Sequence, residues 1–249
     1  MPELIVARYT EDLSWLRKRP ANLTVTIYDK SPDVSGGESV ISLPNVGREA
    51  HTYLHHIVSR YDSLDEWTIF CQGKPFDHAY DFKKFLRDFA FRESKSGANS
   101  LSKPSPDPNI DRIGAVLGFH WLGHMIDTDD NQGARLFRPW SKNEDGRSLD
   151  MRGFHQALFD TDGPDHYQFV LGAQFAVHRD VVYQRPLAFY ERALAVSTTF
   201  PDAAHCFERS WDRVFGVVGI DADWLAGRQT VYLKPMKHQT PGYESPVKP

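Results

Sequence analysis

Short apolar runs flank a punctuated polar segment at the start of the chain. Residues 4–9 (LIVARY) and 23–28 (LTVTIY) are rich in β-branched and aromatic residues, a composition typical of strands. Residues 12–19 carry three apolar positions, follow Thr10 as a candidate N-cap and stop before Pro20, as a short helix does. The pattern predicts that the chain opens as β-α-β.

The clearest helical periodicity follows a further short apolar run at residues 40–43. From Glu49 to Leu64 apolar residues recur at intervals of three and four, as on one face of a helix: Ala50, Tyr53, Leu54, Ile57, Val58 and Tyr61. Three histidines fall on the polar side, where we expect them to be solvated: His51, His55 and His56. Residues 67–71 then predict a buried strand, and residues 82–91 a second amphipathic helix.

Polar and apolar stretches alternate in the second half of the chain. Residues 93–110 and 127–147 are rich in small and polar residues, which predicts irregular loops; a lid is an alternative interpretation of the first. Between them, residues 111–126 are apolar enough to form a helix. Further expected elements are a core strand over 169–177, a helix from Pro186, a helix over 203–215 and a frayed tail over about 238–249.

Strands that alternate with helices at these lengths predict an α/β fold with a three-layer, mostly parallel sheet. A chain of 249 residues fits within one such domain, so we expect a single α/β domain over residues 1–249. In open α/β sheets ligands lie beyond the carboxyl ends of the strands. Candidate site residues are therefore sought just after each strand.

Net charge and hydropathy limit the classes of partner and the cellular compartment that we expect for this protein. A formal net charge of -4 provides no basic field of the kind that nucleic acid or an anionic membrane attracts. No apolar run reaches the roughly 20 residues that span a bilayer, and the first residues lack the pattern of a signal peptide. We therefore expect a cytoplasmic protein that acts on a small molecule. Cys71 and Cys206 are far apart, which favours two reduced, buried thiols and leaves a disulfide as the alternative.

The segment before the periodic helix is a candidate anion site. Residues 45–48 (Asn-Val-Gly-Arg) precede the helix N-terminus, where free N–H groups and the helix dipole favour a phosphate, and Arg48 adds a positive charge. In the alternative interpretation, Asn45 caps the helix and Arg48 pairs with a surface carboxylate.

A second polar segment follows the predicted strand 67–71. Gln72, Asp77 and His78 supply an amide, a carboxylate and an imidazole at a strand end. Asp77 and His78 are candidate ligands of Mn²⁺ or Mg²⁺, held together with substrate phosphates. Alternatively, Asp77 is the N-cap of the next helix and His78 lies in its first turn.

Two other metal-like patterns carry less weight. His120 and His124 lie at i, i+4 of the expected helix, with Asp127 one turn further on, but no Glu stands between the histidines as in a metalloprotease. Asp-x-Asp triplets begin at Asp127, Asp160 and Asp221, and a chain this rich in Asp contains about two by chance. The G-x-S-x-G, Walker and G-x-G-x-x-G patterns are absent from the sequence.

Several segments resemble the domain-of-unknown-function 3431 family, known from fungal and bacterial proteins. They are residues 43–54 (LPNVGREAHTYL), 70–78 (FCQGKPFDH), 172–177 (GAQFAV) and 185–186 (RP). The resemblance extends from Glu3 to about Gly216 and is weakest over residues 93–165. This family has no settled activity, so the resemblance implies relatives more than a reaction.

The layout is also similar to that of the GT-A nucleotide-sugar glycosyltransferases. Four features carry this resemblance: the polar end of the first strand, the turn after a later strand, the Gly-Ala-Gln-Phe segment and an acidic residue on the next helix. This resemblance implies a GT-A-like fold in which Glu208 is the base that deprotonates an acceptor hydroxyl. It implies donor or substrate contacts from Arg8, Asn45, Arg48, Glu49, Gln72 and Gln174. A structural ion pair of Glu208 with Arg209, Arg213 or Arg48 is the alternative.

The leading hypothesis is a glycosyltransferase-like enzyme that transfers a group from a nucleotide-activated donor, with Glu208, Asp77 and His78 as catalytic residues. A second hypothesis is a metal-dependent tailoring or hydrolytic enzyme that uses His120, His124 and Asp127. A third is a non-catalytic binding protein, in which the same polar residues are caps and buried hydrogen-bond partners.

Overall fold

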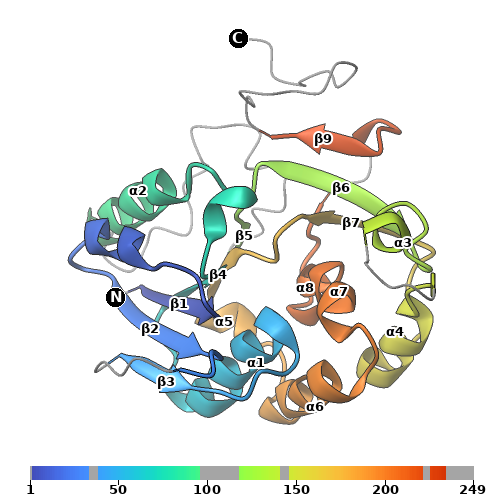
Figure 1. The fold of residues 1–249 in the computed structure, drawn as a ribbon, viewed down its shortest axis with the longest axis horizontal. Helices are drawn as coiled ribbons and strands as arrows, with labels where there is room; N and C mark the ends of the chain where they lie inside the picture. The colour runs from blue at the N-terminus through green and yellow to red at the C-terminus, as the bar shows by residue number, and fades with distance from the viewer. Residues whose placement is uncertain (1, 34–38, 96–117, 141–145, 221–224, 234–249) are drawn as a thin grey trace.

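The computed structural model describes residues 2–33, 39–95, 118–140, 146–220 and 225–233. It contains a six-stranded and a three-stranded sheet (Figure 1), of which the six-stranded one is the larger. Its strands are β1 (Glu3–Arg8), β2 (Thr24–Asp29), β3 (Val40–Ser42), β4 (Trp67–Gln72), β5 (Phe119–Trp121) and β8 (Phe175–His178). Their order is β3-β2-β1-β4-β8-β5. The first four are parallel, whereas β8 runs antiparallel to both β4 and β5. The fold is thus α/β with a mixed sheet, and the expectation of a mostly parallel sheet is corrected.

A second, antiparallel sheet has the order β7-β6-β9. It consists of β6 (Met125–Asp130), β7 (His166–Val170) and β9 (Thr230–Tyr232). The α-helices are α1 (Arg48–Arg60), α2 (Phe82–Lys95), α3 (Phe137–Trp140), α4 (Met151–Phe159), α5 (Arg179–Val182), α6 (Leu187–Thr199), α7 (Ala203–Glu208) and α8 (Trp211–Val214). Three 3₁₀ helices are η1 (Ser14–Lys18), η2 (Tyr61–Ser63) and η3 (Pro75–Asp77).

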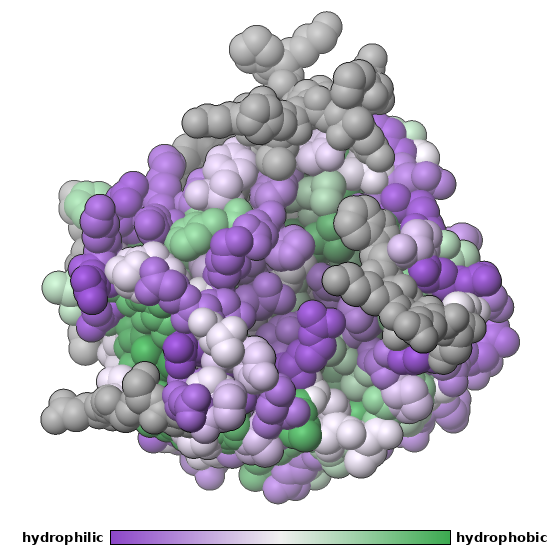
Figure 2. Space-filling view, in the orientation of Figure 1, coloured by the Kyte–Doolittle hydropathy of each residue, from purple (hydrophilic) through white to green (hydrophobic). Residues whose placement is uncertain are grey.

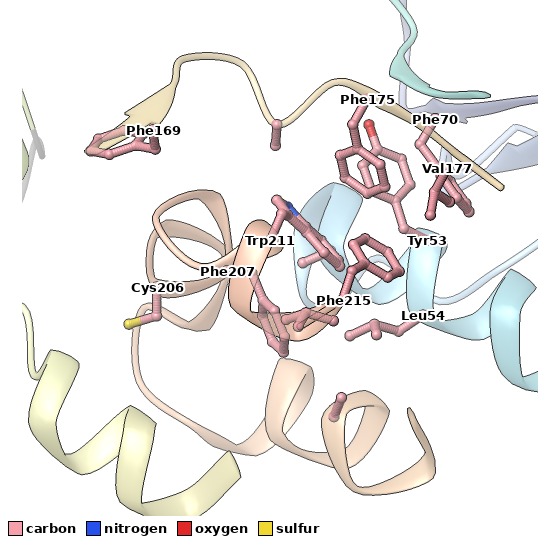
Figure 3. Close-up of a cluster of buried hydrophobic side chains, with 14 of the residues drawn as sticks. Tyr53, Leu54, Phe70, Phe169, Phe175, Val177, Cys206, Phe207, Trp211 and Phe215 are labelled. Carbon is pink, nitrogen blue, oxygen red and sulfur yellow. The ribbon is translucent and has the colours of Figure 1, made fainter. Parts of the chain in front are cut away.

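Side chains alternate between the two faces of the larger sheet along each strand, and each face packs against helices. On one face Ile5 and Phe70 join the core with α1, α6, α7 and α8. On the other face Val6 and Cys71 pack with Trp15 of η1 and with α2. Aromatic rings dominate the first core, where Tyr53, Phe70, Phe175, Phe207, Trp211 and Phe215 converge from two helical regions and two strands (Figure 3).

The predicted strand-helix-strand order at the start of the chain is confirmed, and so are the strand at 67–71 and the helices predicted to begin near residues 49, 82 and 186. The short helix at 12–19 is the 3₁₀ helix η1, whose N-cap is Leu13 rather than Thr10. Cys71 and Cys206 are free and buried, as the first interpretation of the pair expects. The part of loop 93–110 beyond residue 95 and the tail 238–249 lie outside the described residues.

Several expectations for the second half are wrong. The described part of the helix expected at 111–126 is instead β5 and the start of β6. The strand expected over 169–177 is divided between β7 and β8, because the backbone turns at Gly172 and Ala173, both with positive φ. The helix expected over 203–215 is broken into α7 and α8, and the loop expected over 127–147 contains most of β6 and α3.

The histidines of α1 are also corrected. His51 and His56 are buried rather than solvated, because α1 packs on the sheet with one face and on α6 and α7 with others. The His56 ring hydrogen-bonds to the Tyr28 hydroxyl at 3.1 Å and lies 3.4 Å from the Glu3 carboxylate. Burial lowers the pKa of His56 to about 3. Within the described residues, no helix is both long and apolar enough to cross a membrane.

We expect His155 to make the protein less stable in acid. Burial first, and then Arg213, lower the pKa of this buried α4 side chain to about 4. Between pH 6.5 and 4 the unfolded chain takes up a proton at this position that the folded protein refuses, so stability falls as the pH falls. His155→Gln should therefore reduce the pH slope of the free energy of unfolding by about 1 kcal/mol per pH unit in that window.

Urea unfolding at pH 7, 6 and 5 measures this slope. The matched control is His166→Gln, on the exposed side of β7, which should leave the slope unchanged. Equal slopes for wild type and His155→Gln would show that His155 does not stay neutral in the folded protein.

Candidate functional site

The carboxyl ends of β1, β2, β3 and β4 lie at one edge of the larger sheet, because these strands are parallel neighbours. From β1 the sheet grows outward to β2 and β3 on one side and to β4 on the other. In open α/β sheets, ligands bind outside the carboxyl ends of the strands at such a change of direction. Figure 2 shows hydrophilic residues gathered at the centre of the face where β1 and β2 point toward α7.

Arg8 ends β1, and its guanidinium is already engaged. Its Nη1 pairs with the buried carboxylate of Asp29 at the end of β2, and its Nε donates to the Glu11 carbonyl at 3.1 Å. Asp29 also accepts from the Ser31 backbone N–H at 2.8 Å. The structure therefore brings Arg8 to the predicted edge, where it ties β1 to β2.

Lys30, directly after β2, hydrogen-bonds to backbone carbonyl groups at the start of α1. Its buried ammonium donates to the carbonyl oxygens of Val46, at 2.7 Å, and of Arg48. Burial lowers its pKa to about 8, while the nearby Glu49 carboxylate opposes that shift. The loop before α1 is thus held by a charged side chain that the sequence did not single out.

The start of α1 differs from the interpretation in which Asn45 caps the helix. Its N-cap is Gly47, in the left-handed conformation and without a side-chain cap, so the exposed Asn45 is not the cap. Arg48 also has a positive φ of 49°, and its side chain is 66% exposed. The next residue, Glu49, is 13% exposed, and its Oε2 lies 4.0 Å from Nε of Arg48. Burial most of all, and also the charge of Glu208, raise the pKa of the Glu49 carboxyl, while Arg48, its own backbone N–H and Lys30 oppose this.

Glu208, the last residue of α7, faces this helix start. Its Oε1 accepts from the Gly172 backbone N–H at 2.8 Å, and its Oε2 lies 4.0 Å from Nη1 of Arg209. The side chain is 19% exposed, so the carboxylate is oriented yet within reach of solvent. One turn earlier on α7, Nε2 of His205 lies 3.3 Å from Nη1 of Arg48. We call Arg48, Glu49, His205 and Glu208 the Glu208 cluster.

Strained backbone surrounds this cluster. Of the five described non-glycine residues with positive φ, Arg48 belongs to the cluster, Ala173 follows the glycine that contacts Glu208, and Asp202 is the N-cap of α7; the other two are Asp160 and Ala226. Each such residue costs on the order of 1–3 kcal/mol, and such strain concentrates at functional sites. Three of the five such residues therefore lie in or next to the Glu208 cluster, an observation independent of charge.

The segment after β4 lies beside the cluster. Asp77 is 59% exposed and pairs with Lys74 at 3.1 Å, whereas the His78 ring packs against Gly172, the residue that donates to Glu208. The helix α2 begins at Phe82, so Asp77 is not its N-cap. A group of three or more His, Cys, Asp or Glu residues suited to a metal is not found within the described ranges.

The two predicted glutamines differ in accessibility. Gln72 ends β4 at the predicted edge and is half-buried. Gln174 is fully buried, and its amide donates to the Pro75 carbonyl at 3.0 Å, which ties β8 to η3.

The histidines proposed for an alternative metal site do not share a helix face. His120 lies in β5 and stacks on Trp67, and the buried His124 follows that strand. Asp127 lies in β6, where it pairs with Arg135 and accepts from the Thr230 hydroxyl. The i, i+4 argument for that metal therefore fails, because it required a helix.

Sequence reasoning missed Lys30 and His205. His205 stands three residues before Glu208, a spacing that places two side chains on one helix face and could have indicated it. Lys30 carries no such signal, since only the tertiary structure brings it under residues 46–48.

Comparisons with known proteins give one match. No curated protein and no solved structure matches this chain. The matched family range includes the segments 43–54 and 70–78, which confirms the resemblance there, whereas the segments 172–177 and 185–186 lie beyond it. Residues 4–102 of this chain match the family described as "Protein of unknown function (DUF3431)".

Proposed function

We propose that this protein is a glycosyltransferase-like enzyme that transfers a group from a nucleotide-activated donor to a hydroxyl acceptor. The observation that carries the proposal is the Glu208 cluster: an oriented, accessible carboxylate opposite an exposed arginine, beyond the carboxyl ends of parallel strands. The strained backbone around it supports the same location.

In the proposed reaction Glu208 accepts the proton of the acceptor hydroxyl. The acceptor oxygen then forms a bond to the transferred carbon, and the bond from that carbon to the donor phosphate oxygen breaks. The diphosphate leaves with the electron pair. The Gly172 N–H holds one carboxylate oxygen of Glu208, which leaves Oε2 to take the proton.

Arg48 is the better candidate of the two predicted arginines for the leaving diphosphate. Arg8 is committed to Asp29 and to the Glu11 carbonyl, whereas Arg48 projects from the start of α1 with most of its side chain exposed. A guanidinium presents several N–H donors in a fork that suits phosphate oxygens. Arg48 is therefore the arginine that we assign to the leaving diphosphate.

A divalent cation at Asp77 and His78 remains part of the proposal, with limits that the geometry sets. Asp77 already pairs with Lys74, and no third such donor joins these two residues in the described part of the chain. A cation there would take its other oxygen ligands from substrate phosphates and water, as Mg²⁺ commonly does. The proton transfer to Glu208 and the charge of Arg48 do not depend on it.

Ligand-dependent thermal unfolding tests the proposal. We expect a nucleoside diphosphate at about 100 times its Kd to stabilise the native protein by about 2.7 kcal/mol. For a chain of this size, that is a rise in Tm of roughly 5–10 °C. Arg48→Ala should remove most of the rise, and Asp77→Ala should remove any part that depends on Mn²⁺.

The matched control is Arg87→Ala, an exposed arginine on α2, which packs on the other face of the sheet. It should leave the rise unchanged. If GDP, UDP, ADP and CDP, each with and without Mn²⁺, all leave the Tm unaltered, the proposed donor class is wrong.

A further inference from the structure

The contact between Arg48 and His205 has only one chemically consistent form. A guanidinium has N–H donors and no acceptor, so Nε2 of His205 must accept with its lone pair from Nη1 of Arg48, 3.3 Å away. The imidazole is then neutral and carries its proton on Nδ1. This contact joins α7 to the start of α1, two helices that begin 155 residues apart in the sequence, at 48 and 203.

His205 is held more firmly than its partner. Its ring packs edge-on against Phe137 of α3, with centroids 5.1 Å apart. The start of its helix is tied down at Asp202, which makes a bidentate pair with Arg147 at 2.8 and 2.9 Å. The Arg48 side chain, by contrast, is largely exposed, and its Nε lies 4.0 Å from the Glu49 carboxylate.

The backbone of Arg48 is fixed independently of this contact. The Lys30 ammonium donates a hydrogen bond to the Arg48 carbonyl. The preceding residue, Gly47, packs so closely on the Ser197 carbonyl that a Cβ at position 47 would lie 2.6 Å from that oxygen. The anchored part of Arg48 therefore ends at its main chain. The guanidinium itself is contacted at Nη1 by His205, at 3.3 Å, and more distantly at Nε by Glu49, at 4.0 Å.

We propose that His205 is a positioning residue that directs the guanidinium of Arg48 toward the donor diphosphate, and that protonation of His205 releases it. This inference rests on the proposed function for the identity of the ligand. The contact between the two side chains can be tested without that ligand.

Charges from each side set the protonation of His205. Burial is the largest influence and lowers its pKa; Glu208 and Asp202 raise it, while Arg48 and Arg209 lower it, with a net decrease. Phe137, the remaining neighbour, does not titrate. The ring is thus neutral at pH 7 and accepts from Arg48, and the contact is lost as the pH falls through a pKa below 6.5.

An NMR pH titration of the His205 ring tests the contact itself. Arg48→Gln removes a positive charge from beside Nε2, so the pKa of His205 should rise relative to wild type. Arg87→Gln, far from α7, should leave it in place. An unchanged pKa in Arg48→Gln would overturn the proposed contact, whether or not any nucleotide binds.

Binding of GDP and UDP, measured by calorimetry at pH 7, tests the positioning role. His205→Ala should weaken binding roughly tenfold, about 1.4 kcal/mol, and should add nothing in an Arg48→Ala background, because both changes remove the same contact. His205→Gln, whose Oε1 also accepts, should retain most of the affinity. Additive losses in the double variant would refute positioning.

The pH profile separates positioning from a merely structural role. As the pH is lowered below 6.5, affinity should fall more steeply for wild type than for His205→Gln, because the nucleotide phosphate gains a proton with both proteins but only wild type also protonates residue 205. Parallel profiles for the two proteins would refute release by protonation. If wild type binds neither GDP nor UDP, nor ADP or CDP with or without Mn²⁺, the proposed donor class fails, and the NMR titration still decides the contact.

Discussion

Glu208→Gln is expected to lower the rate of transfer by about 10²–10⁴-fold, the usual contribution of a general base. The amide is nearly the same shape as the carboxylate, and its oxygen can still accept from the Gly172 N–H, so the folded structure should be kept. An amide cannot take the acceptor proton. The loss should therefore appear in kcat, with little change in the Tm or in nucleotide affinity.

Release of nucleoside diphosphate from a panel of sugar nucleotides, supplied with hydroxyl acceptors, measures this effect. Glu191→Gln, at an exposed position on α6, is the matched control and should retain full activity. A Glu208→Gln variant with wild-type kcat would remove Glu208 from the mechanism. Activity lost together with several degrees of Tm would assign Glu208 a structural role instead.

Asp129→Ala is expected to have the largest effect on stability among the described charged residues, with a loss of about 3–5 kcal/mol. Asp129 is buried in β6, and its Oδ2 pairs with Nη2 of the equally buried Arg209 at 2.6 Å. Its carboxylate also accepts from backbone N–H groups of residues 130, 135, 136 and 137. Truncation leaves a buried guanidinium without its counter-charge and several N–H groups without their acceptor.

Urea unfolding at pH 7 measures the loss. Asp129→Asn, which keeps the acceptor oxygen and loses the charge, should fall between wild type and Asp129→Ala. The control Asp88→Ala breaks an exposed pair with Lys84 on α2 and should cost less than about 1 kcal/mol. A cost below 1 kcal/mol for Asp129→Ala would mean that Arg209 reaches water once its partner is removed.

This pair also explains the Asp-x-Asp triplet at residues 127–129. Asp127 is neutralised by Arg135, and Asp129 by Arg209, so both carboxylates are engaged with arginines. A triplet in a strand can direct both acids toward internal partners as readily as toward a metal. Which partner the two carboxylates take depends on which cations the fold brings close to them. Here both cations are arginines, Arg135 and Arg209, that follow the triplet in the sequence.

Local pattern was sufficient where one face of an element is apolar and the neighbours are close in sequence. The periodic apolar positions from Ala50 to Ile57 predicted α1, and the β-branched runs predicted β1 and β2, because these patterns match the geometry of a helix and of a pleated strand. Polar residues at strand ends were also placed at one edge of the sheet, since Arg8 ends β1 and Gln72 ends β4, its parallel neighbour.

Pattern failed where the backbone changes direction without proline. Residues 169–177 look like one strand, yet positive φ values at Gly172 and Ala173 divide them between two sheets. Residues 203–215 look like one helix, and they break after Glu208. Both breaks adjoin the Glu208 cluster, where strain is stabilised by surrounding contacts that no local window of sequence contains.

The sequence by itself determined the first two strands, the helix between them and α1, because each depends on residues that are close together along the chain, and the alternation of such elements gave the α/β class. Only the tertiary structure decided that the sheet is mixed, that His51 and His56 are buried, and that Lys30 and His205 adjoin the predicted residues. The physical reason is distance along the chain: α1 and α7 meet because both bury aromatic side chains in the core that contains Tyr53 and Trp211, and their polar ends come together as a consequence of that packing.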